Sequence, residues 1–173
     1  MGIIAVLAGL GIAGMSVFRR TVQIEQAKND LLSGFREAQN LSRNSVSSSV
    51  KSSDILKGQV AGYAIFFDAS QSNNYSLRYC VQTSFLGQTR YDCTGVERAT
   101  AKQFINSEVQ ISPSNPNKCR GIFFARISGD ISAMSSDISQ LDDTGTCDIN
   151  LSHSQGSETR QIHVNLMENN ISV

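Results

Sequence analysis

The stretch MGIIAVLAGLGIAGMSVFRR, residues 1–20, contains no charged residue before Arg19 and Arg20. An α-helix rises 1.5 Å per residue, so the first eighteen residues span roughly 27 Å, close to the thickness of a bilayer's hydrocarbon core. The apolar residues point in every direction around such a helix, and a helix of this kind is buried in lipid or among other helices. We therefore predict a helix that resides in a membrane or in the core of an assembly. Its apolar residues are Ile3, Ile4, Val6, Leu7, Leu10, Ile12, Met15, Val17 and Phe18.

The residues that flank this stretch disfavour two other interpretations. A secretory signal peptide carries basic residues before its apolar stretch and a small-residue cleavage site after it. Here the basic pair follows the stretch and nothing basic precedes it. A core helix of a soluble domain is usually shorter and apolar on one side only.

The helical pattern continues beyond the arginines but changes its character. Apolar residues recur at steps of three and four on one side, and charged residues occupy the other, which predicts an amphipathic helix that packs against a folded domain. If it runs unbroken to about residue 45, the helix is near 70 Å long. The serine-rich run SRNSVSSSVKSSD then ends it, because serine favours caps and turns over helix interiors. The predicted packing residues are Ile24, Ala27, Leu31, Phe35, Ala38 and Leu41.

Beyond the serine-rich run the apolar period becomes two, which is typical of strands. The runs GYAIFFD and YSLRYCVQ flank a turn-rich segment and predict a hairpin. The segment PSNPNKC, which holds both prolines of the chain, predicts a loop. The expected fold class is α+β, with one long helix on an antiparallel sheet. We divide the chain into a membrane or fibre-core segment (residues 1–20), an amphipathic continuation with its serine-rich exit (21–50) and a β-rich head (51–173). Further strands are predicted at residues 103–112, 121–128, 147–153 and 160–167.

The head contains four cysteines, Cys80, Cys93, Cys119 and Cys147, and no C-x-x-C pair. Zinc sites usually draw their ligands from closely spaced pairs, so the spacing favours two disulfides over a metal site. Disulfides imply an oxidising compartment outside the cytoplasm. Three connectivities are open, of which Cys80–Cys93 with Cys119–Cys147 closes the shortest loops.

Composition and motifs give no indication of catalysis, of a cofactor or of a metal. The net charge is zero and no basic stripe is present, which argues against nucleic acid as the main partner. A catalytic triad requires a base held against a nucleophile, and His153 and His163 among many serines do not indicate one. The segment LDDTGTCD, with Asp142, Asp143 and Asp148, could supply calcium ligands but lacks the spacing of an EF-hand loop. We interpret it as a solvated acidic turn.

Three stretches resemble the type IV pilin-like proteins, in particular the H-type minor pseudopilins of type II secretion and the minor pilins related to them. GIIAVLAGLGIAG is similar to the apolar half of the pilin helix, FREAQNLSRNSV to the place where that helix meets its head, and RQIHVNLMENNISV to the closing strands of the H-type head. The resemblance implies a single-pass subunit of the inner membrane with an extracytoplasmic head. Its expected partners are membrane lipid, other pilin or pseudopilin subunits, the assembly machinery, and a secreted cargo or surface ligand.

The resemblance also gives a second meaning to Gly9, Gly11 and Gly14. Glycine costs about 1 kcal/mol relative to alanine inside a helix, and in membranes it allows helices to pack closely. In pilin-like fibres such glycines would let the helix unwind locally as the subunit leaves the bilayer.

The sequence departs from the family at its start. Family members carry a short basic leader ending in glycine, then a residue that becomes N-methylated, then a glutamate that helps to register subunits. None of these is present here. Either the start is truncated or misplaced, or the protein is not processed as a pilin. We expect a truncated start, because the two arginines after the stretch would by themselves keep the head in the cytoplasm, whereas disulfides indicate an oxidising compartment. The alternative is a single-pass anchored binding domain, of adhesin or DNA-capture type, that does not polymerise.

Overall fold

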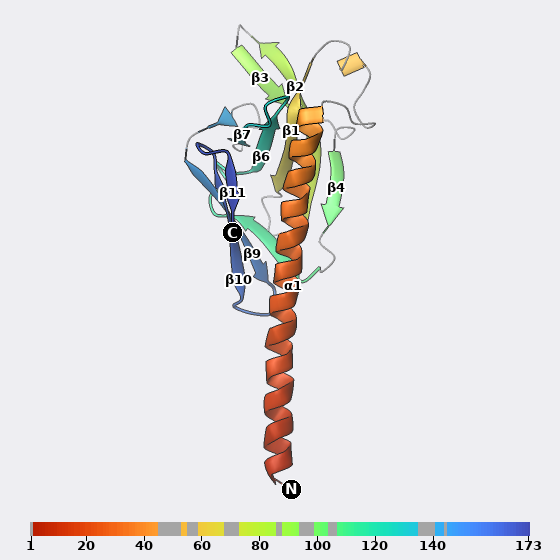
Figure 1. The fold of residues 1–173 in the computed structure, drawn as a ribbon, viewed down its shortest axis with the longest axis vertical. Helices are drawn as coiled ribbons and strands as arrows, with labels where there is room; N and C mark the ends of the chain where they lie inside the picture. Colours follow the sequence, from red (N-terminus) through yellow and green to blue (C-terminus); the bar gives the residue numbers. More distant parts are fainter. Residues whose placement is uncertain are drawn as a thin grey trace.

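The computed structural model describes residues 2–44, 53–54, 59–67, 73–85, 88–93, 99–103, 107–134, 141–143 and 145–173. The side chains of residues 2–14, 84–85, 88 and 99–103 lie outside this description. A long N-terminal helix is followed by antiparallel strands, so the fold class is α+β, as the sequence predicts (Figure 1).

Helix α1 (Gly2–Asn44) has 43 residues, which corresponds to a length of about 65 Å. Its C-terminal half lies against the head, and its N-terminal half extends beyond it (Figure 1). The predicted packing face is buried, except that Leu41 is partly buried and packs against the core. The buried members are Ile24, Ala27, Leu31, Phe35 and Ala38. Of the residues predicted for the membrane or fibre core, those before Met15, the three glycines included, have side chains outside the described part.

The larger sheet has seven strands in the order β3-β2-β1-β6-β7-β8, with β4 also paired to β2. Strands β1 and β2 form the predicted hairpin, with Ile65 opposite Leu77. The strands are β1 (Val60–Phe67), β2 (Asn74–Phe85), β3 (Gln88–Asp92), β4 (Ala99–Gln103), β6 (Gly121–Ala125), β7 (Ile131–Met134) and β8 (Leu141–Asp142).

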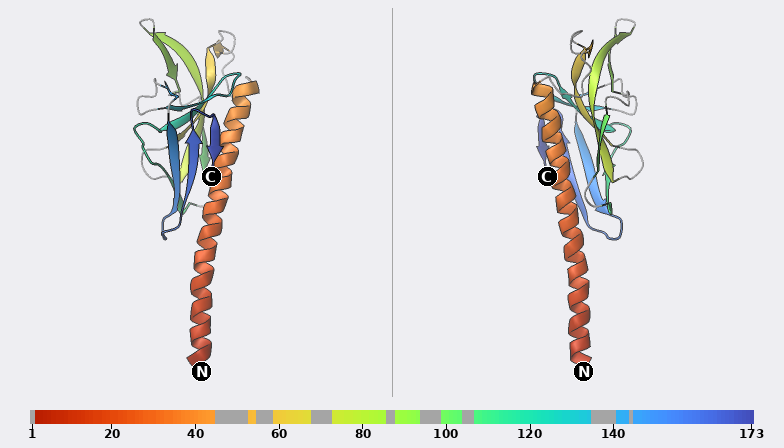
Figure 2. Two further views of the ribbon diagram at one scale, coloured as in Figure 1. Left: turned by 60° about the vertical axis from the view of Figure 1, so that its left-hand side comes forward. Right: turned by 90° about the vertical axis from the view of Figure 1, so that its right-hand side faces the viewer.

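The smaller sheet has four strands in the order β11-β10-β9-β5. Strand β9 is central and pairs with both β5 and β10. The helix passes along one side of both sheets (Figure 2), contacting β1 and β6 of the larger sheet and β5, β9 and β10 of the smaller one. The strands are β5 (Val109–Pro113), β9 (Thr146–His153), β10 (Thr159–Asn165) and β11 (Asn170–Ser172).

Phe35 is the centre of the contact between helix and sheet. It is 1% exposed, and its ring centroid lies 6.5 Å from that of Phe67 and 6.2 Å from that of Phe124. Gly34 beside it allows a similarly close approach, since a Cβ there would lie 2.7 Å from the hydroxyl oxygen of Tyr75. Aromatic side chains of β1, β2 and β6 therefore pack directly against the helix.

The far face of the larger sheet is covered as well. A second apolar cluster combines Phe66, Phe123 and Met134 with Ala64, Cys80 and Cys93. The described side chains of β1 alternate between the two clusters, Ile65 and Phe67 in the first, Ala64 and Phe66 in the second. This explains why GYAIFFD is almost continuously apolar.

Two disulfides join Cys80 to Cys93 and Cys119 to Cys147. The first links β2 to the residue that follows β3, within one sheet. The second links the segment before β6 of the larger sheet to β9 of the smaller one. Of the three connectivities open from the sequence, the chain therefore adopts the one with the shortest loops.

The single predicted sheet was wrong, because the strands separate into two sheets. Residues 103–112, predicted as one strand, include the last residue of β4 in the larger sheet and most of β5 in the smaller one. Pro113, predicted in a loop, ends β5 opposite Ile149. An edge strand tolerates proline, since it needs hydrogen bonds on one side only.

Ser42 fastens the end of the helix to the sheet, although the sequence did not single it out. Its side chain is buried, and its hydroxyl donates to the carbonyl oxygen of Phe124 at 2.9 Å. The same oxygen accepts from the amide of Tyr63 at 3.2 Å, and the Ser42 carbonyl accepts from the amide of Ile127 at 3.1 Å. These bonds attach the C-terminal end of the helix to β1, to β6 and to the turn after β6.

Candidate functional site

Helix α1 carries a second apolar row where it leaves the head. Met15, Phe18 and Val22 are 75%, 70% and 46% exposed. Their spacing of three and four places them on one helix face. The packing face begins only at Ile24, and Phe18 and Val22 lie on the opposite side of the helix from it. Met15 also borders a pocket that the helix forms with the head. This row, which we call the outer row, has no partner among the described residues.

Val17, also predicted for the membrane or fibre core, is 48% exposed. Among the residues that the structure describes, no helix is both long enough and apolar enough to cross a membrane.

A pocket of about 420 Å³ lies where the helix emerges from the head, and we call it the neck pocket. The helix contributes Met15, Ser16, Arg19, Arg20 and Gln23 to it. The head contributes three residues near the turn between β9 and β10, the part of the head nearest the protruding half of the helix (Figure 1). These are Glu108, His153 and Gln155.

His153 forms the buried wall of the neck pocket. Its Nδ1 accepts from the backbone amide of Gln155 at 3.1 Å, so Nε2 carries the proton. Nε2 faces the Gln23 Oε1 atom at 3.0 Å and the Glu108 Oε2 atom at 3.2 Å. The imidazole, at the end of β9, thus contacts both the helix and the turn that precedes β5.

Strand alternation could have located His153. In CDINLSH the residues Cys147, Ile149 and Leu151 are buried, and His153 occupies the next inward position. From the sequence alone we consider this histidine only as a catalytic base, and we assign no role to Glu108. No local pattern indicates Glu108, since it lies in the turn before β5, far from His153 in the chain.

An ion-pair network attaches the helix to β10 close to the neck pocket, on the side toward the C-terminal end of the helix. The Glu25 Oε1 atom accepts from Arg160 Nε at 2.7 Å, and Glu25 Oε2 pairs with Lys28. The hydrogen bonds from Lys28 and then Arg160 hold the pKa of Glu25 below its ordinary value. The carboxylate therefore stays ionised and holds the network together at neutral pH.

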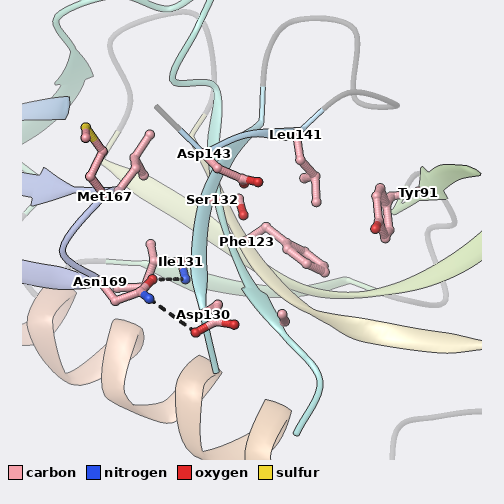
Figure 3. A pocket seen from close by; sticks show the side chains of 11 residues that line it. Tyr91, Phe123, Asp130, Ile131, Ser132, Leu141, Asp143, Met167 and Asn169 are labelled. Atoms are coloured by element: carbon pink, nitrogen blue, oxygen red, sulfur yellow. Dashed lines mark hydrogen bonds between the residues drawn. The ribbon is translucent and has the colours of Figure 1, made fainter. Parts of the chain in front are cut away.

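A second pocket of about 420 Å³ lies on the head and is shown in Figure 3; we call it the head pocket. Tyr91 and Phe123 form an aromatic wall, with ring centroids 5.4 Å apart. Asp130 and Asp143 contribute carboxylates to the lining. An aromatic wall with carboxylates at its edge suits a cation with an apolar stem.

Asn169 closes one end of the head pocket. Its Oδ1 accepts from the backbone amide of Ile131 at 2.7 Å, and its Nδ2 donates to the Asp130 Oδ1 atom at 3.2 Å (Figure 3). Its φ of 51° lies in the left-handed region, which asparagine tolerates better than most residues. The Asn-rich turn before β11 is the signal that could have identified it.

The predicted acidic turn is divided between the two sheets. Asp142 belongs to β8 and Asp143 follows it at the head pocket, whereas Asp148 lies in β9 and its Oδ1 atom is 2.8 Å from Nδ1 of His163. His163 is exposed and lies on β10. Within the described residues, no group of three or more histidine, cysteine or acidic side chains is placed to hold a metal ion.

Comparison of the chain with protein-family models, curated proteins and solved structures finds no match. The features of the molecule that bear on its function are the outer row, the neck pocket and the head pocket.

Proposed function

We propose that the chain is a structural subunit of a filament of the type IV pilin or type II secretion pseudopilin kind. The subunit is held in the inner membrane by the first part of α1, with its head outside the cytoplasm, and it enters the filament through that helix. In this proposal the subunit acts by assembling with others, and it catalyses no reaction.

The outer row is the observation that carries this proposal. An exposed apolar row of Met15, Phe18 and Val22 needs lipid or another helix, since water is an unfavourable environment for it. Residues 1–14, which precede it, are apolar in sequence as well. Lipid satisfies these side chains before assembly and neighbouring helices satisfy them afterwards, so little apolar surface meets water at any stage.

The two disulfides and the form of the helix's attachment support the same proposal. Disulfides persist in oxidising compartments, which is consistent with an extracytoplasmic head. Ser42 attaches the C-terminal end of the helix to the head, and His153 attaches it at the neck pocket. Glu25 attaches it at a point between these two. A subunit that is pulled out of lipid by its neighbours needs such an attachment, so that the head follows the helix as one body.

A single-pass anchored binding domain is the second candidate, and the head pocket is the observation that suggests ligand binding. A pocket with an aromatic wall and two carboxylates could receive a cationic group of an external ligand. The same head pocket would serve cargo binding in a filament subunit, so the two candidates differ in self-association and not in the pocket.

Fractionation with chemical cross-linking tests the proposal. We expect the chain in bacterial envelopes to resist alkaline carbonate extraction and, with a short amine-reactive cross-linker, to give products with its own copies or with another subunit that has an apolar N-terminal helix. An integral but exclusively monomeric chain would favour the anchored binding domain. A chain released by carbonate would contradict both candidates.

A further inference from the structure

The neck pocket opens toward the side from which the apolar part of the helix protrudes. Met15 is its apolar lip, and Arg19 and Arg20 follow one turn later on the same helix. If the preceding residues lie in lipid, this level of the helix is where the phosphate groups of the lipids lie. We propose that the neck pocket binds a phospholipid headgroup that carries a primary ammonium, of the phosphoethanolamine type. This inference rests on the membrane residence proposed above.

The helix supplies the donors for the phosphate. Arg19 and Arg20 each present a planar guanidinium, which pairs with two phosphate oxygens at once. Gln23 adds a third donor, because its Oε1 faces the His153 Nε2 proton at 3.0 Å and its NH₂ group points away from that ring. The tautomer of His153, fixed by Gln155, thus orients the amide of Gln23.

The head supplies the acceptor for the ammonium. Glu108 is anchored by His153 at 3.2 Å and by the side-chain amide of Gln155 at 3.4 Å. Its side chain is 43% exposed, so a three-donor ammonium in the pocket can reach the carboxylate.

Charges of both signs line the pocket, since Glu108 borders the same space as Arg19 and Arg20. Glu158 lies outside this lining, although a Cβ on Gly156 would overlap with its carboxylate and lie 3.3 Å from Arg20 Cδ. A phosphate diester with an attached ammonium carries both complementary charges, whereas a headgroup without an ammonium offers no cation to Glu108.

The two histidines of the chain provide a local readout. His153 forms the wall of the neck pocket, whereas His163 is exposed and paired with Asp148. We suggest labelling the histidine rings of the full chain with ¹³C and keeping it in maltoside micelles, which contain no phosphate. Titration with dihexanoyl phosphatidylethanolamine should shift the His153 ring signal to saturation and leave the His163 signal in place.

Four ligands distinguish the chemistry. Dihexanoyl phosphatidylethanolamine should bind more tightly than the phosphatidylcholine, whose ammonium has no N–H donor, and than the phosphatidylglycerol, which has no ammonium. Free phosphoethanolamine has the same polar groups without the acyl chains, and we expect it to bind more weakly than the lipid. Equal affinity for the three lipids, or tighter binding of free phosphoethanolamine, would overturn the inference.

Variants identify the contacts. Arg19→Gln should weaken binding of the ethanolamine lipid about tenfold, as expected for a lost charge-assisted contact. Glu108→Gln should weaken binding of the ethanolamine lipid and leave that of the phosphatidylglycerol unchanged. Arg36→Gln is the matched control, since Arg36 is exposed farther along the same helix, and should have no effect. Equal effects of Arg19→Gln and Arg36→Gln would contradict a specific site.

The chain could cross-link normally in envelopes and yet show no change of the His153 signal with the ethanolamine lipid. That result would overturn this inference and leave the proposed function standing.

Discussion

The side chain of Asn169 takes the place of a strand partner for Ile131. Its Oδ1 accepts the hydrogen bond of the Ile131 backbone amide at 2.7 Å, on an edge of β7 that the two-residue strand β8 reaches only at Ala133 and Met134. Asn169 belongs to the turn between β10 and β11 of the smaller sheet. One amide side chain therefore joins the two sheets of the head.

Two substitutions of Asn169 should separate the contribution of its side-chain hydrogen bond from that of its tolerance for a positive φ. Asn169→Ala loses the bond to a buried strand and places alanine at a positive φ, and should cost about 2–4 kcal/mol of unfolding free energy. Asn169→Gly loses the bond alone and should cost about 1–3 kcal/mol. Denaturant melts measure both, with Asn170→Ala as an exposed neighbouring control expected within about 0.5 kcal/mol of the parent. A glycine variant no better than the alanine variant would show that the backbone conformation contributes nothing.

Phe35 and Arg36 are neighbours with opposite surroundings. Phe35→Ala should leave a cavity between the helix and the rings of Phe67 and Phe124, and should cost about 3–5 kcal/mol. Arg36→Ala, on the exposed face, should cost under about 0.5 kcal/mol. Equal losses in denaturant melts would mean that the helix packs through another face.

The longer disulfide loop should contribute more to stability. Cys119 and Cys147 are separated by 28 residues and join the two sheets, whereas Cys80 and Cys93 are separated by 13. In the loop-entropy description, their removal costs about 4 and about 3 kcal/mol respectively. Paired substitutions to alanine, compared by thermal unfolding, measure the difference.

Mass mapping of the exported protein after alkylation should find no free thiol, and four alkylated cysteines would contradict the disulfides altogether.

Stability should fall in acid partly through Glu25. Lys28 and Arg160 lower the folded-state pKa of this carboxyl below its ordinary value of 4.5. The contribution is therefore present above pH 4.5 and is lost as the pH falls through the lower folded-state pKa. Glu25→Gln removes the titrating group, so its stability curve should approach that of the parent as the pH drops. A constant difference between the two curves from neutral pH to acid would show that the network is not titrating.

The helix could be predicted from sequence because its signal is local. Ile24, Leu31 and Phe35 recur with the helical period, and the serine-rich run marks the end. The hairpin of β1 and β2 was predicted for the same reason, since its strands are adjacent in the chain. The Cys119–Cys147 pairing depended on loop length alone, and the sequence left it open.

The sites depend on contacts that no local pattern contains. His153 meets Gln23 across 130 residues, and Asn169 meets Ile131 across 38. The division into two sheets also depends on the pairing of β5 with β9, which follows it by more than thirty residues in the chain. Periodicity predicts which face of a strand is buried, but it does not identify the neighbouring strand.

The outer row has a polar continuation that provides an internal control. Phe18 and Val22 are followed on the same helix face by Asn29 and Arg36, which are exposed beside the head. A subunit that packs through the lower helix should contact its neighbours most closely at Phe18. Replacing Phe18 by alanine should reduce cross-linked products without changing the stability of the head.

Photocross-linking from position 18 tests directly whether the subunit assembles through its N-terminal helix. A photoreactive amino acid replaces Phe18 in the full chain, the envelopes are irradiated, and the products are mapped by mass spectrometry, with position 29 as the matched control. We expect products joined to the apolar N-terminal helix of a second subunit, either a copy of this chain or another subunit, and far fewer from position 29. Products with lipid alone from position 18, in envelopes where the chain is abundant, would contradict assembly through this helix.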